Sequence, residues 1–226
     1  MSTYFDVPFT RFLGDLNLKK IIIISTAGVT PKNFTPKENE DFILIPSDTP
    51  IGDLEISHRH FNSSILENDL NPVFPIERLR ELQAEGKIGG PTEKHISVFG
   101  FHLLQSRIKR EIAPRIAEIA DAEEAGAALF LAGCIVCHRT AQGIQHVVED
   151  YGIPTVMITQ HPAVTRMGHP PRALYPMGFR PGHAAGLPNQ PELQKQVIMD
   201  ALKLLTTLEE PGLVVEKSYA NFATVE

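Results

Sequence analysis

The stretch AALFLAGCIVCHRTAQGIQHVVEDYGIPTVMIT, residues 127–159, decides the fold. An apolar run ends at Gly133, Cys134 and Cys137 follow, and a segment of helical character leads through Gly152-Ile153-Pro154 into a second apolar run. This order predicts a strand, a turn, a helix and a second strand, which together form a βαβ unit. In such a unit the carboxyl end of the first strand meets the amino end of the helix at the edge where ligands bind, so we expect both thiols there.

Apolar runs and helical patterns alternate along the rest of the chain. Runs that predict strands lie at 21–24, 41–46 and 95–100, and helical spacing covers 76–82, 102–124 and 190–205. The alternation predicts an α/β fold with a parallel sheet and helices on both faces, in the doubly wound, Rossmann-like arrangement. We expect one domain over residues 1–226, with sub-lobes near 20–125 and 126–206. Residues 1–19 predict a short helix, the Pro- and Gly-rich stretch 161–191 a long loop, and the last twenty residues a tail.

Composition narrows the class of protein. The 226 residues are 42% hydrophobic and 21% charged, as in soluble globular proteins. A formal net charge of −6 with 21 Lys and Arg argues against a nucleic-acid binder. No apolar run approaches the roughly 20 residues of a membrane span, and the first residues lack a signal-peptide pattern. We therefore expect a cytoplasmic protein that binds neither nucleic acid nor a membrane.

The two cysteines offer a redox or nucleophilic site. Because a helix N-terminus carries partial positive charge and unpaired amides, it stabilises a thiolate and lowers its pKa. Cys134 would then attack a substrate, and Cys137, one turn away, would displace the adduct and close a disulfide. His138 and Arg139 follow directly, and we expect His138 to support proton transfer and Arg139 to hold an anionic substrate.

Other segments add candidate binding residues. The first apolar run ends at Ser25, Thr26 and Gly28, in a turn whose free amides suit an anion. The alternative is that this turn only ends the strand. Asp48 and Thr49 follow the second run in a turn with capping potential, and we expect both turns to shape the substrate pocket. His58 and His60 share one side if extended. Such a pair binds a metal or a carboxylate, or consists of one packed and one exposed imidazole.

Three other interpretations of the cysteine pair compete. One is a Cys2His2 zinc site completed by two of the histidines 58, 60, 138 and 161, since a structural zinc takes four ligands. Another is a thioredoxin-like oxidoreductase, although that fold is about half as long. The third is a pair of small buried side chains on a core strand.

Several ordered motifs carry a resemblance to a known family. They are STAGV (25–29), IPSDTP (45–50), SH (57–58), NPVFPIERLREL (71–82) with Gly86, IGG (88–90), AGCIVCHRT (132–140) and GIPTV (152–156). Over about residues 21–205 the chain resembles the selenoprotein B subunits of the glycine, sarcosine, betaine and D-proline reductases, and most closely those of D-proline reductase.

The resemblance implies an oxidoreductase with a partner. In the family, selenocysteine stands at the position of Cys134 and cysteine at that of Cys137, and His-Arg follows as His138-Arg139 does here. A separate subunit supplies a pyruvoyl group that holds the substrate amine, the selenolate attacks the α-carbon, and the C–N bond breaks reductively. His58 lies in a matched motif and is a second candidate for acid–base support.

Cysteine in place of selenocysteine changes the expected reaction. A thiol is a weaker nucleophile than a selenol, so either this chain is a natural cysteine variant that breaks an easier bond (C–S, S–S or an activated C–N), or selenocysteine was replaced. The bulky Ile135-Val136 favours the natural variant. We expect a reductase subunit that acts on a small amino-acid-like or sulfur-containing substrate, with no metal or cofactor of its own, a thiol electron donor and a homo-oligomeric state. The alternative is a metal-binding or non-catalytic scaffold subunit that needs a pyruvoyl-bearing partner.

Overall fold

A computed structural model describes residues 7–37, 40–57, 63–66, 69–99 and 104–220. Eight strands form one sheet, in the order β10-β9-β8-β7-β1-β6-β3, with β5 also paired to β1. Their bounds are β1 (Lys20–Ser25), β3 (Phe42–Pro46), β5 (Gly90–Pro91), β6 (Lys94–Val98), β7 (Ala127–Leu131), β8 (Thr155–Ile158), β9 (Arg172–Pro176) and β10 (Leu213–Lys217). Every pairing is parallel except that of β3 with β6. The predicted α/β class is confirmed.

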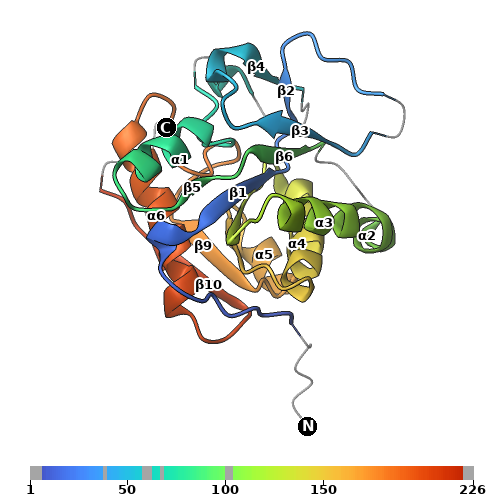
Figure 1. The fold of residues 1–226 in the computed structure, drawn as a ribbon, viewed down its shortest axis with the longest axis vertical. Coiled ribbons are helices and arrows are strands. Elements are labelled where there is room, and N and C mark those ends of the chain that lie inside the picture. Colours follow the sequence, from blue (N-terminus) through green and yellow to red (C-terminus); the bar gives the residue numbers. More distant parts are fainter. Residues whose placement is uncertain (1–6, 38–39, 58–62, 67–68, 100–103, 221–226) are drawn as a thin grey trace.

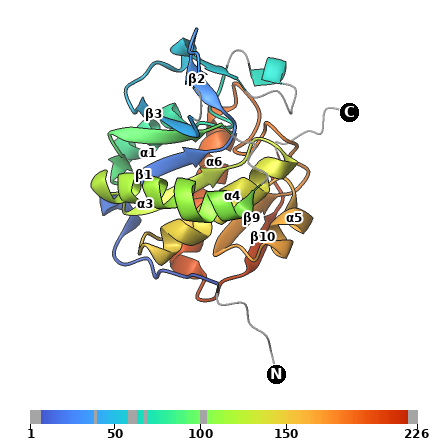
Figure 2. The same cartoon turned by 90° about the vertical axis from the view of Figure 1, so that its right-hand side faces the viewer.

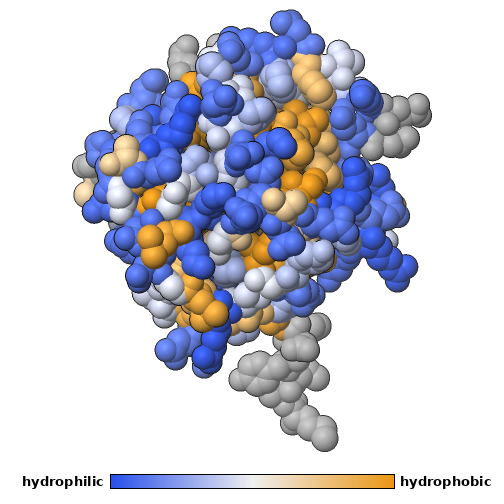
Figure 3. Space-filling view, viewed as in Figure 1, coloured by the Kyte–Doolittle hydropathy of each residue, from blue (hydrophilic) through white to orange (hydrophobic). Residues whose placement is uncertain are grey.

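Helices cover both faces of the sheet (Figure 1, Figure 2). One face carries α1 (Ile76–Ala84) and α6 (Pro191–Thr207), and the other carries the π-helical turn η4 (Ile108–Ile112), α3 (Ala113–Ala122) and α4 (Ile135–Asp150). A hydrophobic core lies on each face of the sheet, and alternate residues of β1 belong to one or the other. Ile21 and Ile23 pack towards α1 and α6, while Ile22 and Ile24 pack towards α3 and α4. Figure 3 shows mainly hydrophilic side chains on the surface of one side, with apolar side chains in separate patches.

Smaller elements complete the chain. They are η1 (Leu16–Leu18), η2 (Ile51–Asp53), η3 (Ser63–Leu66), α2 (Gln105–Arg107), α5 (Pro162–Met167) and the antiparallel pair of β2 (Val29–Pro31) and β4 (Leu54–Ile56). The helix predicted over 102–124 is thus three consecutive helical segments: α2, η4 and α3. The short helix predicted near the N-terminus is, within the described part of residues 1–19, only the turn η1.

Two of the irregular segments predicted from the sequence contain regular structure. The stretch 161–191 is not one long loop, because α5 and β9 lie within it. The last twenty residues are not simply a tail, because β10 pairs in parallel with β9 over Leu213–Lys217. Proline and glycine there mark the ends of short elements, and the elements are stabilised by pairing with a neighbouring strand or packing on a helix.

The N-terminal segment is held to the body by a buried ion pair. Arg172 on β9 and Glu149 on α4 lie 2.8 Å apart with no exposed side-chain surface. Thr10 donates its backbone N–H to the Glu149 carboxylate, and its own carbonyl accepts from Arg172 at 2.7 Å. The guanidinium also stacks over the ring of Phe9 at 3.8 Å. A segment from the start of the chain is thereby fixed to two elements from its second half.

Candidate functional site

Cys134 forms the N-cap of α4, at the carboxyl end of β7. Its backbone is extended, with φ −143° and ψ 177°, and its Sγ accepts the backbone N–H of Cys137 at 3.4 Å. The sulfur therefore takes the place of the hydroxyl or carboxylate oxygen that usually caps a helix. A negative charge on this sulfur is stabilised by that N–H and by the helix dipole. The predicted strand, turn and helix are confirmed.

The two thiols lie together and differ in surroundings. Neither cysteine forms a disulfide, and both are buried, with 5% of Cys134 and none of Cys137 exposed. The hydrogen bond to Cys134 and burial raise the pKa of the Cys137 thiol well above its usual range. Of the pair, Cys137 is thus the one that keeps its proton, and Cys134 is the one placed to carry the charge.

His138 is fully buried and engages both ring nitrogens. Its Nδ1–H donates to the carbonyl of Cys134 at 2.6 Å, and its Nε2 accepts the backbone N–H of Gln160 at 3.1 Å. Burial lowers the pKa of this imidazole to about 3, so it is neutral near pH 7. These contacts tie the cysteine turn to the end of β8, and they leave neither ring nitrogen free for proton transfer.

His161 is the site residue that the sequence did not single out for catalysis. It follows β8 and caps α5, and its ring meets that of His138 edge to face at a centroid distance of 5.0 Å. Its Nε2 is buried and has no hydrogen-bond partner. Burial lowers the pKa of His161, and the charge of the nearby Cys134 opposes this shift. The available signal was topological, because β8 lies next to β7 and both strands end at the cysteine edge.

The turn after β1 lies against the cysteine turn. The hydroxyl of Thr26 donates to the carbonyl of Cys137 at 3.4 Å, and the Thr26 N–H donates to Leu131 at the end of β7. The Ser25 hydroxyl accepts from the N–H of Ala27, inside its own turn. Gly28 has φ +64°, a left-handed conformation that suits glycine. These residues support the turn that carries the thiols.

Asp48 and Thr49 lie at the opposite edge of the sheet, which corrects their predicted place in the pocket. β3 runs antiparallel to β6, and its last residue, Pro46, pairs with Lys94 at the start of β6. The carboxyl end of β3 is therefore beside the amino ends of the parallel strands, away from Cys134. His58 and His60 lie outside the described residues.

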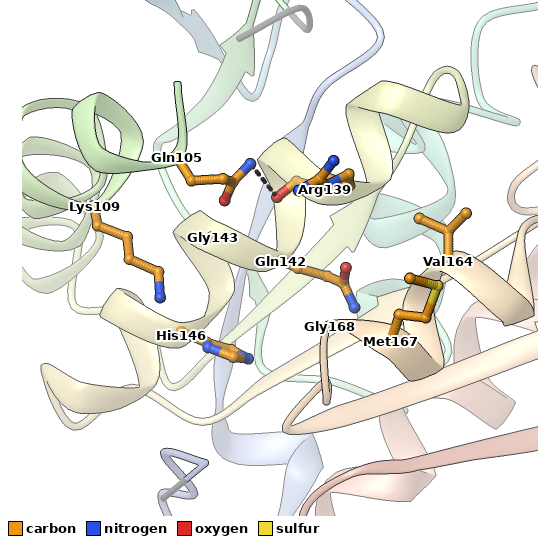
Figure 4. A pocket seen from close by; sticks show the side chains of 9 residues that line it. All are labelled: Gln105, Lys109, Arg139, Gln142, Gly143, His146, Val164, Met167 and Gly168. Carbon is orange, nitrogen blue, oxygen red and sulfur yellow. Dashed lines mark hydrogen bonds between the residues drawn. The ribbon is translucent and has the colours of Figure 1, made fainter. Parts of the chain in front are cut away.

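Arg139 faces a cavity on the outer side of α4. This cavity of about 400 Å³ lies between α2, η4, α4 and α5 (Figure 4), and neither cysteine lines it. The backbone carbonyl of Arg139 accepts from Gln105 at 3.4 Å across one end of the cavity. The lining residues are Gln105, Lys109, Arg139, Gln142, Gly143, His146, Val164, Met167 and Gly168. Arg139 thus lines a cavity to which neither thiol contributes.

The described residues show neither a metal-binding cluster nor a membrane-spanning helix. Within the described ranges, no group of three or more His, Cys, Asp and Glu side chains is placed to hold a metal ion. No helix in that same part of the chain is long and apolar enough to cross a membrane.

Sequence comparison finds relatives among reductase subunits. The D-proline reductase subunit gamma of Acetoanaerobium sticklandii is 34% identical over 221 residues, which cover 96% of this chain and 90% of that subunit. The glycine reductase complex component B subunits gamma of Symbiobacterium thermophilum and Carboxydothermus hydrogenoformans are 26% and 25% identical over 96% of this chain, and the match covers 53% and 52% of their own lengths. No family model matches the sequence, and no solved structure matches the chain.

Proposed function

The chain belongs to the family of the D-proline reductase gamma subunits and the glycine reductase component B gamma subunits, and from this we propose that it is the thiol-bearing subunit of a reductase complex. Its reaction is the reductive cleavage of a C–N or C–S bond in a small amino-acid-like or sulfur-containing substrate. The observation that supports this most directly is the position of the Cys134 sulfur at the N-cap of α4, hydrogen-bonded to its neighbour Cys137.

The proposed cycle has two displacement steps that balance. The Cys134 thiolate attacks the electrophilic carbon, an S–C bond forms, and the C–N or C–S bond breaks with its electron pair going to nitrogen or sulfur, which takes a proton. Cys137 then loses its proton and attacks the Cys134 sulfur, so that an S–S bond forms and the carbon leaves with the pair and is protonated. The substrate gains two electrons, the dithiol becomes a disulfide, and a dithiol electron donor reduces it again.

Other residues of this chain support the cysteine turn, supply a proton and bind an anion. His138 holds the cysteine turn to β8, and Thr26 supports the carbonyl of Cys137. His161 contacts the ring of His138 and has an unpartnered nitrogen, so we assign to it the proton that the leaving group takes. Arg139 lines a cavity that neither thiol lines, so its role as the anion-binding residue requires a substrate or partner that spans the first turn of α4.

A pyruvoyl group on a partner subunit is part of this proposal. When bound, that group supplies a carbonyl that holds the substrate amine. The unpartnered polar atoms of Gln160 and His161 beside the cysteine turn fit a substrate presented from outside the chain. Exposed apolar side chains at Leu104 and Ile135 flank the first turn of α4 and suit a protein contact at this edge.

Paired cysteine variants test the proposal. The full chain, purified together with the pyruvoyl-bearing partner, is supplied with D-proline and a dithiol. Cys134→Ser should abolish turnover, because the nucleophile is gone. Cys137→Ser should stop after the first displacement and leave an adduct on Cys134 whose mass equals protein plus intact substrate, since opening the ring loses no fragment. Full activity in both variants would refute the dithiol mechanism.

A further inference from the structure

Gln160 is a buried side chain whose amide has no partner. It lies two residues after the end of β8 and is 5% exposed, and neither its Oε1 nor its Nε2 makes a hydrogen bond. The next residue, His161, also has a buried and unpartnered Nε2. Gln160 and His161 thus carry three polar atoms that are shielded from bulk water and have no hydrogen-bond partner.

Both residues are joined to the thiol turn through His138. The backbone N–H of Gln160 donates to His138, whose Nδ1–H donates to the carbonyl of Cys134. The ring of His161 packs edge to face on the same His138 ring. Burial lowers the pKa of His161, and the charge of Cys134 acts in the opposite direction. Gln160 and His161 are therefore fixed to the cysteine turn through one shared imidazole.

Leaving such atoms unpaired is costly. A buried polar group without a partner costs about 1–3 kcal/mol, and native proteins retain few of them unless water or a ligand supplies the missing bond. A glutamine amide presents an N–H donor and a C=O acceptor side by side. Its complement is a ligand group with a carbonyl acceptor and an N–H donor on adjacent positions, of which a carboxamide is the simplest example.

We propose that Gln160 and His161 form a recess that binds such a donor–acceptor group of the substrate and holds it next to the carbon that Cys134 attacks. This inference rests on the proposed function, because it assigns the recess to the substrate of Cys134. Gln160 acts as a specificity-determining residue, and it distinguishes electrophiles that carry a carboxamide-like group from those that do not.

Two small thiol reagents test the recess without the natural substrate. Cys137→Ser leaves Cys134 as the only thiol, since the chain has two cysteines. Iodoacetamide carries a carboxamide, and its reaction forms an S–C bond as iodide leaves with the C–I electron pair. Methyl methanethiosulfonate carries no N–H, and its reaction forms an S–S bond as methanesulfinate leaves. Intact-mass spectrometry follows both rates.

Gln160→Met in the Cys137→Ser chain removes both polar atoms at constant side-chain length. We expect the iodoacetamide rate to fall about tenfold, as the loss of one to two hydrogen bonds predicts, while the methanethiosulfonate rate changes less than twofold. The Tm should stay equal or rise, because an unpaired buried amide is removed. Gln145→Met is the matched control: Gln145 is also buried with an unpartnered Oε1, but its Nε2 donates to Arg172 on β9, and neither rate should change.

The other possible outcomes distinguish a failure of the Gln160 recess from a failure of Cys134 as the nucleophile. Equal rate changes with both reagents, or no change with either, overturn the recess and leave the thiolate function standing. A Tm lowered by several degrees also overturns it, because the amide would then have a structural partner within the protein. Failure of Cys134 to react with either reagent when Gln160 is intact refutes the proposed nucleophile itself.

Discussion

Two hydrogen bonds determine the protonation of His138. A backbone carbonyl accepts at Nδ1 and a backbone N–H donates to Nε2, so the proton must reside on Nδ1 and the ring must be neutral. The imidazole cannot gain a second proton without losing its bond to Gln160. We therefore interpret His138 as a positioning residue, which differs from the acid–base role inferred from its place beside Cys137.

Matched variants at His138 separate positioning from proton transfer. Met and Gln have the same length, but only Gln provides an acceptor for Gln160 and a donor for Cys134. His138→Met should lower the free energy of unfolding by about 2 kcal/mol, since the Gln160 N–H is left unsatisfied, and His138→Gln should recover part of this loss. Urea unfolding at pH 7.5 measures both. Equal stability of the two variants would contradict the positioning role.

At single positions, the sequence predicts the placement of a residue where topology alone determines it. It places Cys134 and Cys137 at the sheet edge, because a strand followed by a helix must have its connecting turn there. His161 was overlooked as a catalytic candidate because nothing in its immediate neighbours marks it, and its importance depends on β8 being adjacent to β7. Asp48 and Thr49 were misplaced because an apolar run does not reveal the direction of its strand.

At the scale of elements, α4 depends on its cap, and the cap is the proposed nucleophile. Serine is a strong N-cap and alanine a weak one. Cys134→Ser should therefore leave the Tm unchanged or raise it, while Cys134→Ala should cost about 1 kcal/mol. Thermal unfolding of the two variants provides the comparison. If both lose the same stability, the sulfur does not cap the helix, and loss of turnover in Cys134→Ser would need another explanation.

The contact between α4 and α5 depends on a glycine. A Cβ at Gly168 would overlap the side-chain amide of Gln142, which donates to the carbonyl of Thr165 at 2.6 Å. Gly168→Ala should destabilise the protein by about 1–3 kcal/mol, as overpacking usually does. Gly52→Ala is the control, since no atom lies within 4 Å of its added Cβ, and it should stay within about 0.5 kcal/mol. Chemical denaturation of both variants is the measurement, and similar values would contradict the packing argument.

Elements were predictable from the sequence where one pattern was strong. The four isoleucines of β1 and the apolar runs of β7 and β8 identified strands buried on both faces. The elements α5, β9 and β10 were overlooked because they are short and lie among prolines and glycines, whose local preferences favour turns. Pairing with β8 and β9 stabilises the two strands, and packing against α4 stabilises α5. Such contacts between distant segments are invisible in a local window of sequence.

For the whole molecule, buried neutral imidazoles predict a loss of stability in mild acid. Burial lowers the pKa of His95 and of His138 to about 3, whereas in the unfolded chain both titrate near 6.5. Below pH 6.5 the unfolded state binds protons that the folded state does not, so stability falls as pH falls towards 3. Each imidazole should cost about 1 kcal/mol between pH 6.5 and 5.5. Burial also raises the pKa of Glu149. The folded state therefore binds this proton more tightly than the unfolded state, and Glu149 adds stability as the pH falls through its titration range.

Unfolding by urea at pH 7.5, 6.5 and 5.5 tests this dependence. His95 accepts the backbone N–H of Ile23 through Nδ1, and the Asn carbonyl in His95→Asn can replace that acceptor. This variant should show a shallower decline between pH 6.5 and 5.5, whatever its stability at pH 7.5. A flat profile in the unmodified protein would show that the two imidazoles are not buried as described.

The pairing of β1 with β7 has a consequence for synthesis on the ribosome. Ile21 lies opposite Ala127, so one side of β1, with its four isoleucines, stays unpaired until the chain has grown to that point. At roughly 5–20 residues per second this wait is on the order of ten seconds. The N-terminal segment waits longer, because Arg172 must emerge before Thr10 and Phe9 can dock. A nascent chain stalled before β7 would therefore expose an unpaired, apolar edge of β1 to chaperones and to neighbouring chains.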